Sequence, residues 1–276
     1  MQAKLPDDIK EVVSVALQED IGSGDLTSSL IDSDTQAHAR VIAREQAILC
    51  GIEWFNEVYR QIGSSIEIKW QFEDGDQIDA DQYICNIKGP ACKLLTGERT
   101  ALNFLQMLSG TATSTHEMVT LISDLDCRLL DTRKTIPGLR KAQKYAVLCG
   151  GGHNHRMGLY DAILIKENHI AAAGDISTAI KKAKVKNVPI EIEVESLDDL
   201  QQALSENADS ILLDNFTIDE LRQAVDLAKG KVTLEASGNI NKENLRQIAE
   251  TGVDYISTGT LTKHIRAIDF SMRFET

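Results

Sequence analysis

Four basic side chains follow two neighbouring apolar runs and have the spacing of an anion-binding site. Arg133 and Lys134 come directly after CRLLDT, and Lys166 ends DAILIK. Arg156 lies between them, in the loop GGHNHRMGLYD. Arginine binds carboxylate or phosphate through a planar fork, and lysine binds them as a point charge. Since four such cations in one pocket would repel one another, we predict that an anion binds among them; the alternative is ordinary surface charge.

Acidic residues follow the next two β-branched runs. Glu195 comes after IEIEV and Asp214 ends SILLD. Glu191 and Glu193 share one face of the first run with Glu195, because side chains two apart in a strand point the same way. Carboxylates there can bind sugar hydroxyls, coordinate Mg²⁺ directly or through water, or stabilise developing positive charge. Ion pairing with Lys166 is a compatible structural role.

The last two runs end in small hydroxyl and glycine residues that suit a phosphate. Ser237 and Gly238 lie in EASGNI, and Thr258, Gly259 and Thr260 lie in STGTLT. Such segments offer free backbone N–H groups and hydroxyls. Each motif alone is common in ordinary turns, but two at successive strand ends are typical of barrel phosphate sites.

Two other residue types give weaker signals. His153 and His155 are two apart, but no third metal ligand has a suitable spacing, and the adjacent Arg156 disfavours a cation. Hydrogen bonding of His155 to an anionic substrate is the better interpretation. The five cysteines form no C-x-x-C pair and no zinc-like spacing, so we expect reduced thiols, mostly small core residues.

The elements that position these residues alternate regularly. From residue 127 onward, short β-branched runs alternate with helical segments, which predicts βαβ units and a parallel sheet. An open doubly wound sheet would fit the alternation, but it brings only the strand ends near its switch point together. A barrel brings every strand end to one mouth. We count six units, fewer than eight, so we predict a small or incomplete barrel.

The first half has a different pattern. Residues 6–20 have helical apolar spacing, residues 51–63 a second helix, and the segments around them the alternation of antiparallel strands. Residues 91–123 look mainly helical and are expected to link the two halves.

Composition restricts the class of protein. The chain has 276 residues, 42% hydrophobic and 26% charged, as in soluble globular proteins. A net charge of −13 disfavours nucleic acid and anionic membrane as partners, yet residues 128–166 hold eight basic and only two acidic side chains. This pattern favours a small anionic ligand, although three of the eight, Arg140, Lys141 and Lys144, are expected simply to coat a helix. No run is long enough to cross a bilayer and the N-terminus has no apolar signal region, so we expect a cytoplasmic protein.

These motifs together resemble the quinolinate phosphoribosyltransferase family, the carboxylating nicotinate-nucleotide pyrophosphorylases. The resemblance covers nearly the whole chain and is carried, in order, by GDLTS, GERTALN, DTRKTIPGLR, GGHNHRMGLYDAILIKENH, EIEVE, LLDNF, EASGNI and ISTGTLT. It implies an N-terminal α/β sandwich over residues 1–110, completed by residues 267–276. It also implies an incomplete, about seven-stranded α/β barrel over residues 111–266, whose seventh strand the sequence does not place.

The resemblance implies the reaction as well. Quinolinate and phosphoribosyl pyrophosphate give nicotinate mononucleotide, pyrophosphate and CO₂ in NAD biosynthesis, with Mg²⁺ as the cofactor. By analogy, quinolinate binds to one set of residues: Thr132, Arg133, Lys134, His155, Arg156 and Lys166. Lys134, Glu195 and Asp214 would meet the ribose and the Mg²⁺-bound donor. The 5′-phosphate would bind to Ser237, Gly238, Asn239, Thr258, Gly259 and Thr260.

Arg99, in GERTALN, lies far along the chain from the barrel residues. In the family this arginine reaches the active site of a neighbouring subunit, which implies a homodimer or a higher assembly. The alternative is an arginine on the face of a long helix.

Three other functions remain open at this stage. A Schiff-base aldolase would use Lys166, which is flanked by acids. A related phosphoribosyltransferase would use another ring acid, such as nicotinate. A binding barrel without catalysis is disfavoured, because cations, acids and phosphate loops occur together.

Overall fold

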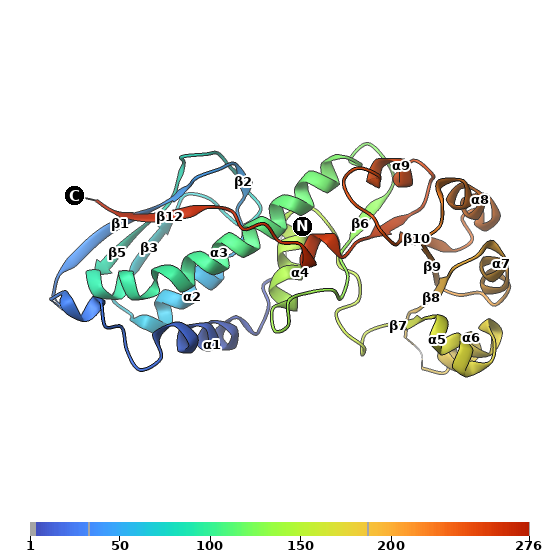
Figure 1. The fold of residues 1–276 in the computed structure, drawn as a ribbon, viewed down its shortest axis with the longest axis horizontal. Helices are drawn as coiled ribbons and strands as arrows, with labels where there is room; N and C mark the ends of the chain where they lie inside the picture. Colours follow the sequence, from blue (N-terminus) through green and yellow to red (C-terminus); the bar gives the residue numbers. More distant parts are fainter. Residues whose placement is uncertain (1–3, 33, 187, 276) are drawn as a thin grey trace. The chain divides into compact units, whose positions relative to one another are not determined.

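The computed structural model describes residues 4–32, 34–186 and 188–275 (Figure 1). The chain forms two compact units. The first contains Met1–His116, Ile136–Gly151 and His264–Thr276, and the second contains Glu117–Thr135 and Gly152–Lys263. The segment Ile136–Gly151 thus packs with the first unit, although the expected boundary at residue 110 placed it in the barrel.

The first unit is built on an antiparallel sheet with the strand order β12-β1-β5-β3. Its strands are β1 (Gln36–Ala43), β3 (Glu67–Trp70), β5 (Tyr83–Pro90) and β12 (Phe270–Phe274). Since β12 pairs along β1, the last residues of the chain complete this sheet. A two-stranded ribbon joins β2 (Ala47–Ile48) to β4 (Gln77–Ile78).

Three helices of this unit bury apolar faces in one core with the sheet. They are α1 (Ile9–Ile21), α2 (Ile52–Ile62) and α3 (Ala91–Thr120), with a short 3-10 turn at Ser28–Leu30. In α1 the buried residues are Ile9, Val13 and Leu17, four apart as helical periodicity predicts. Trp54 and Phe55 of α2 are fully buried. The predicted helices and antiparallel strands of this half are therefore present.

The second unit contains a parallel sheet of six strands with the order β6-β11-β10-β9-β8-β7. The strands are β6 (Arg128–Leu130), β7 (Ile163–Ile165), β8 (Ile190–Val194), β9 (Ser210–Asp214), β10 (Thr233–Ser237) and β11 (Tyr255–Ser257). Strands β6 and β7 follow each other in sequence but lie at opposite edges of the sheet, so the barrel is incomplete, as predicted.

In the described part of the chain, the position of a seventh strand is marked only by a short pairing beside β6. His153 forms a single parallel bridge with Leu130 on the edge of β6 that faces away from β11. Asp131 N–H donates to the carbonyl of His153 at 3.0 Å, which continues this pairing for one step. The segment containing the predicted histidines therefore lies beside β6 without becoming a named strand.

Helices cover one face of the parallel sheet (Figure 1). The helices that contact its strands are α6 (Ile176–Lys184), α7 (Leu197–Ser205), α8 (Ile218–Ala228) and α9 (Leu245–Ala249). Two short helices, α5 (Glu167–Ala173) and α10 (Thr260–Lys263), follow β7 and β11 in the chain. Side chains of Asp175, Ser196 and Thr217 cap α6, α7 and α8 by accepting backbone N–H bonds. These caps fix where each helix starts after its strand, and so fix the loops at the barrel mouth. No helix among the described residues is both long and apolar enough to span a membrane.

Helix α4 (Arg140–Cys149) corrects one interpretation of the basic segment. The sequence pattern suggested that Arg140, Lys141 and Lys144 coat a helix surface. Lys141 does so, and it pairs with Asp7 at 2.6 Å. Lys144 is instead fully buried.

Candidate active site

The carboxyl ends of the parallel strands surround a cavity of about 300 Å³ in the second unit. It gathers side chains from strands that are more than 100 residues apart in the sequence. The predicted residues that line it are Thr132, Arg133, Lys134, His155, Arg156, Lys166 and Ser237. Leu164, Glu193, Leu212, Glu235 and Ser257 line it as well. One cavity thus holds the whole cationic set that the sequence analysis singled out.

The other predicted residues lie outside this lining. Arg99 is exposed on α3, in the other unit. Glu195 is exposed just after β8, and Asp214 is half-buried at the end of β9. The remaining members follow β10 and β11 at the same end of the sheet: Gly238, Asn239, Thr258, Gly259 and Thr260.

The segment after β6 is anchored on both sides, which positions Arg133 and Lys134. Asp131 is fully buried, and its Oδ1 accepts the backbone N–H of His155 at 2.9 Å. Thr262 Oγ1 donates to the carbonyl of Lys134 at 2.8 Å. The two basic residues therefore lie between fixed points, and their side chains line the cavity.

Two arginines, Arg133 and Arg156, line this cavity. The Nε of Arg133 is buried without a hydrogen-bond partner. Burial lowers the pKa of Arg156, and the charge of Arg133 lowers it further. A buried cationic donor without an acceptor is costly, and so is a like-charge neighbour. The pair is therefore arranged for an anion that binds between or beside them.

His155 is oriented by hydrogen bonds at both ring nitrogens. Its Nδ1 accepts the backbone N–H of Arg156 at 2.7 Å. The Nε2 lies 2.9 Å from Oε2 of Glu191, so this nitrogen carries the proton and donates to the carboxylate. Although burial opposes it, the bond from His155 helps to hold the pKa of Glu191 below its usual range. The ring thus links the interior of the barrel to the backbone that carries Arg156.

Glu235 is a second carboxyl beside the same ring, and the sequence analysis did not assign it a role. Its Oε2 lies 3.5 Å from Nε2 of His155, and its Oε1 is buried without a partner. Burial raises the pKa of Glu235 to about 7, and the charge of Glu191 acts in the same direction. The signal was available in the sequence, because Glu235 and Ser237 are two apart in one strand and must share a face.

The protonated state of Glu235 gives a testable pH dependence. The unfolded side chain has a pKa near 4.3, so between about pH 5 and 7 the folded chain binds more protons than the unfolded chain. Stability should therefore fall as the pH rises, by up to about 1.4 kcal/mol per pH unit from this group. Glu235→Gln lacks this loss. Its free energy of unfolding, measured with urea, should therefore rise relative to that of the wild type from pH 5 to 8.

Glu191→Gln is the matched control. Because the pKa of Glu191 is lowered, the stability that its charge contributes is lost as the pH falls. The free energy of unfolding of Glu191→Gln should therefore rise relative to that of the wild type as the pH is lowered. Equal pH profiles for wild type and Glu235→Gln would contradict a protonated Glu235.

Lys166 forms an ion pair with the interior of the barrel. Its Nζ donates to Oε2 of Glu193 at 2.6 Å. Burial raises the pKa of Glu193; Lys166 opposes the rise and Asp214 adds to it. Sequence reasoning had allowed for such a pair between Lys166 and an interior acid, and the structure confirms it. The pair holds the ammonium group at the edge of the cavity.

The loops after β9 and β10 are packed tightly against each other. Gly238 has φ +98°, and a Cβ there would lie 2.2 Å from Oδ1 of Asn215. Asn215 and Asn239 both have positive φ, and Nδ2 of Asn239 donates to Oδ1 of Asn215 at 3.3 Å. These local conformations expose backbone groups at the mouth, as a phosphate-binding loop requires.

The loop after β11 is tied to the loop after β10 through one carbonyl. The hydroxyls of Thr258 and Thr260 donate to the carbonyl of Ile240 at 2.9 and 3.2 Å. A Cβ on Gly259 would lie 2.7 Å from Cδ of Lys134, so glycine allows that side chain to cross close to the loop. The two predicted phosphate loops therefore form one connected surface next to the cations.

The carboxylates of Glu195 and Asp214 suit a Mg²⁺ ion that is bound together with a substrate. Among residues 4–32, 34–186 and 188–275, no cluster of three or more potential metal ligands within 4.8 Å of one another includes Glu195 or Asp214. Mg²⁺ commonly binds through one or two carboxylates together with substrate phosphates and water, rather than in a protein cage. The exposed Glu195 and the half-buried Asp214, at the same end of the sheet as the predicted phosphate loops, are compatible with that mode of binding.

Comparison with known proteins identifies the family of the chain. The model of the quinolinate phosphoribosyl transferase N-terminal domain matches residues 25–109, and that of the C-terminal domain matches residues 111–273. A probable carboxylating nicotinate-nucleotide pyrophosphorylase of Bacillus subtilis (strain 168) is 42% identical over 267 residues, which are 96% of this chain and 92% of that protein. A chloroplastic carboxylating nicotinate-nucleotide pyrophosphorylase of Arabidopsis thaliana is 38% identical over 292 residues, covering 98% and 83%.

A solved structure gives the same result for the fold. The nicotinate-nucleotide pyrophosphorylase from Francisella tularensis superposes with a TM-score of 0.97 at 51% identity, over 100% of this chain and 99% of that one. Both domain models, the relatives and this structure agree over nearly the whole sequence. The chain therefore belongs to the quinolinate phosphoribosyl transferase family.

Proposed function

We propose that this chain transfers the phosphoribosyl group of phosphoribosyl pyrophosphate to quinolinate and releases pyrophosphate, CO₂ and nicotinate mononucleotide, a step of de novo NAD biosynthesis. One observation carries the proposal beyond family membership: Arg133, Arg156 and Lys166 converge on a single cavity in which the Nε of Arg133 has no partner. Quinolinate is a dianion, and one of its two carboxylates supplies the acceptor that Nε of Arg133 lacks.

The aromatic acid binds among the cations in this proposal. Arg133 and Arg156 each take a carboxylate through their forked N–H groups, and Lys166 adds a charge from the edge. Thr132 and Lys134 line the same cavity and complete the contact surface. His155 positions Arg156 through its backbone, and a direct contact with quinolinate would require one ring nitrogen to exchange its present partner.

The sugar donor binds across the mouth. Its 5′-phosphate occupies the surface formed by the loops after β10 and β11, from Ser237 to Asn239 and from Thr258 to Thr260. Glu195 and Asp214 accept hydrogen bonds from the ribose hydroxyls and hold Mg²⁺. When bound, Mg²⁺ neutralises the pyrophosphate and makes it a better leaving group.

The chemistry needs charge control more than covalent catalysis. The bond from the anomeric carbon to the pyrophosphate oxygen breaks, positive charge develops on the ribose, and the pyridine nitrogen bonds to that carbon. Glu195 and Asp214 stabilise the positive charge, and Lys134 stabilises the departing anion. As CO₂ leaves, the electron pair of the carbon–carboxylate bond next to the nitrogen stays on that ring carbon, where the adjacent pyridinium charge stabilises it, and the carbon then takes up a proton.

A product assay tests the proposal. The chain is incubated with quinolinate, phosphoribosyl pyrophosphate and Mg²⁺, and CO₂ and nicotinate mononucleotide are measured. We expect the two products in equal amounts, and no turnover when nicotinate replaces quinolinate. Turnover of nicotinate in preference to quinolinate would overturn the assigned substrate, and no turnover of either would overturn the reaction.

The Schiff-base alternative is disfavoured by the ion pair of Lys166. A Schiff base requires a free amine, whereas Nζ of Lys166 is held by the carboxylate of Glu193 at 2.6 Å. Borohydride reduction with a carbonyl substrate should therefore leave Lys166 unmodified.

We also propose a cytoplasmic homodimer in which Arg99 acts in the partner's site. Arg99 is exposed on α3, so alanine at this position should not lower the melting temperature. We expect Arg99→Ala to raise KM for quinolinate at least tenfold, because a charged contact to a carboxylate is lost. The five cysteines are free, as expected for a reducing compartment.

Mixing two weakened variants, assayed at a quinolinate concentration well below KM, tests the sharing of the site directly. In a dimer of Arg99→Ala and Arg133→Ala chains, one of the two sites has neither substitution. An equal mixture that exchanges subunits should therefore recover about a quarter of the wild-type activity. If the mixture is no more active than the two variants assayed separately, Arg99 acts within its own chain or not at all.

A further inference from the structure

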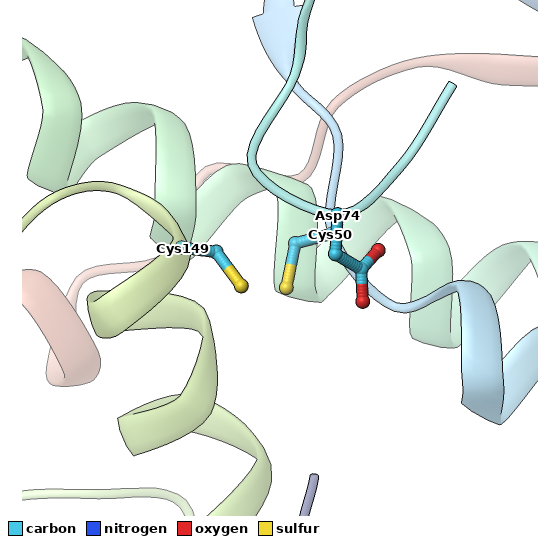
Figure 2. A group of neighbouring side chains, drawn as sticks. All are labelled: Cys50, Asp74 and Cys149. Atoms are coloured by element: carbon cyan, nitrogen blue, oxygen red, sulfur yellow. The ribbon is translucent and has the colours of Figure 1, made fainter. Parts of the chain in front are cut away.

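Two cysteines and an aspartate meet in the first unit, away from the residues that the proposed reaction uses. The Sγ atoms of Cys50 and Cys149 and a carboxylate oxygen of Asp74 all lie within 4.8 Å of one another. Figure 2 shows the two sulfurs facing each other, with the carboxylate beside Cys50. Since Cys50 and Cys149 are about 100 residues apart, their spacing in the sequence does not predict the pair.

Each of the three residues is held by a different part of the fold. Cys50 follows β2, and its backbone N–H donates to Oγ of Ser109 at 2.9 Å. Asp74 lies in the turn before β4, and Cys149 is the last residue of α4. Gly75, next to Asp74, packs so near the end of α4 that a Cβ there would lie 3.5 Å from the carbonyl of Cys149. The cluster therefore does not depend on a mobile segment.

The carboxylate of Asp74 is oriented by protein donors and has one acceptor position left. Its Oδ1 accepts the backbone N–H groups of Gly51 and Ile52 at 2.9 and 3.1 Å. Its Oδ2 accepts the hydroxyl of Tyr145 at 2.8 Å. A carboxylate has about four lone-pair positions, so one remains on Oδ2. Ligating carboxylates in metal sites are held by outer hydrogen bonds in this way.

The cluster has an open side. Asp74, Tyr145 and Cys149 line a cavity of about 700 Å³, whereas Cys50 is fully buried behind them. Ligands of a tetrahedral zinc ion lie roughly 3–4 Å from one another, so small side-chain rotations would close the three around an ion. A fourth ligand, water or a small molecule, can enter from the cavity. Sites with three protein ligands and one open position are typical of reactive zinc.

We propose that Cys50, Asp74 and Cys149 form a binding site for a thiophilic divalent cation of the Zn²⁺ class. Two thiolates and a carboxylate are ligands that such an ion prefers, and its charge would neutralise three acidic groups that face one another in a largely buried place. Binding displaces the two thiol protons and the ion takes their place. The site is independent of the carboxylates proposed to hold Mg²⁺ at the barrel mouth.

The test is titration of reduced, metal-free full-length protein with Co²⁺ followed by Zn²⁺. We expect one Co²⁺ per chain with near-ultraviolet absorption from thiolate-to-metal charge transfer, which Zn²⁺ then abolishes because it binds more tightly. Carboxylates at the barrel mouth cannot produce that absorption. A wild-type chain without it, or one in which Cys50 and Cys149 form a disulfide that excludes the metal, overturns the proposal.

Two substitutions assign the site. Cys149→Ser should lose most of the absorption and weaken Co²⁺ binding at least tenfold, while Cys92→Ser, another half-buried cysteine of the same unit, should match the wild type. If Cys149→Ser does not fold, Tyr145→Phe keeps the ring and removes only the hydroxyl that orients Asp74. Its affinity should fall on the order of tenfold. The assignment is refuted if a folded Cys149→Ser variant, or the Tyr145→Phe variant, binds Co²⁺ as tightly as the wild type does.

Discussion

Replacing Arg133 with alanine should lower kcat/KM for quinolinate about a hundredfold and leave the chain at least as stable as the wild type. Hydrogen bonds to a charged group contribute about 1.5–3 kcal/mol, and about 3 kcal/mol corresponds to roughly a hundredfold. Stability should not fall, because Nε of Arg133 has no partner and its charge lies against Arg156. Steady-state kinetics and thermal unfolding measure the two effects.

Two further variants separate charge from geometry. Arg133→Lys keeps the positive charge and loses the planar fork, so its kcat/KM should lie between wild type and alanine. Arg128→Ala removes an exposed arginine at the start of the same strand, and its kinetics should match the wild type. If Arg133→Ala lowers the melting temperature by as much as it lowers activity, the residue is structural and the proposed anion contact is wrong.

The grouping of the basic residues around Arg133 could be predicted from the sequence. Parallel strands have their carboxyl ends at the same end of the sheet, and the curvature of a barrel brings the basic residues after β6 and β7 to one mouth, although these strands lie at opposite edges. Their mutual repulsion then had to be offset by a ligand, because nothing in the local sequence supplies enough acid. The alternation of strands and helices predicted the parallel sheet, which the six parallel strands confirm, and the polar residues at the strand ends favoured a barrel over an open sheet.

The parts that could not be predicted depend on contacts distant in sequence. Helix α4 has the periodicity of a barrel helix, yet it packs in the first unit, and Lys144 is buried. Periodicity shows that a helix has an apolar face but not which surface covers that face. The pairing of Cys50 with Cys149 is hidden for the same reason. Only the role of Glu235 had a local signal, the alternation of side chains along β10.

The largest effect outside the cationic cluster is expected at Gly238. In Gly238→Ala the new Cβ would lie 2.2 Å from Oδ1 and 2.9 Å from the backbone nitrogen of Asn215, at φ +98°. The backbone nitrogen cannot move freely, because it donates to the carbonyl of Ser237 at 2.9 Å. The loops after β9 and β10 must therefore separate. We expect kcat/KM for phosphoribosyl pyrophosphate to fall at least a hundredfold and unfolding to require about 2–3 kcal/mol less.

Gly230→Ala is the matched control for backbone strain. Gly230 also has positive φ, +70°, but no heavy atom lies within 4 Å of a Cβ built there. This variant should lose about 1 kcal/mol of stability and keep its activity, because the strain is present without the clash. The difference between the two alanine variants measures what the contact with Asn215 contributes. Equal kinetics for both would show that the close packing of these loops does not shape the phosphate surface.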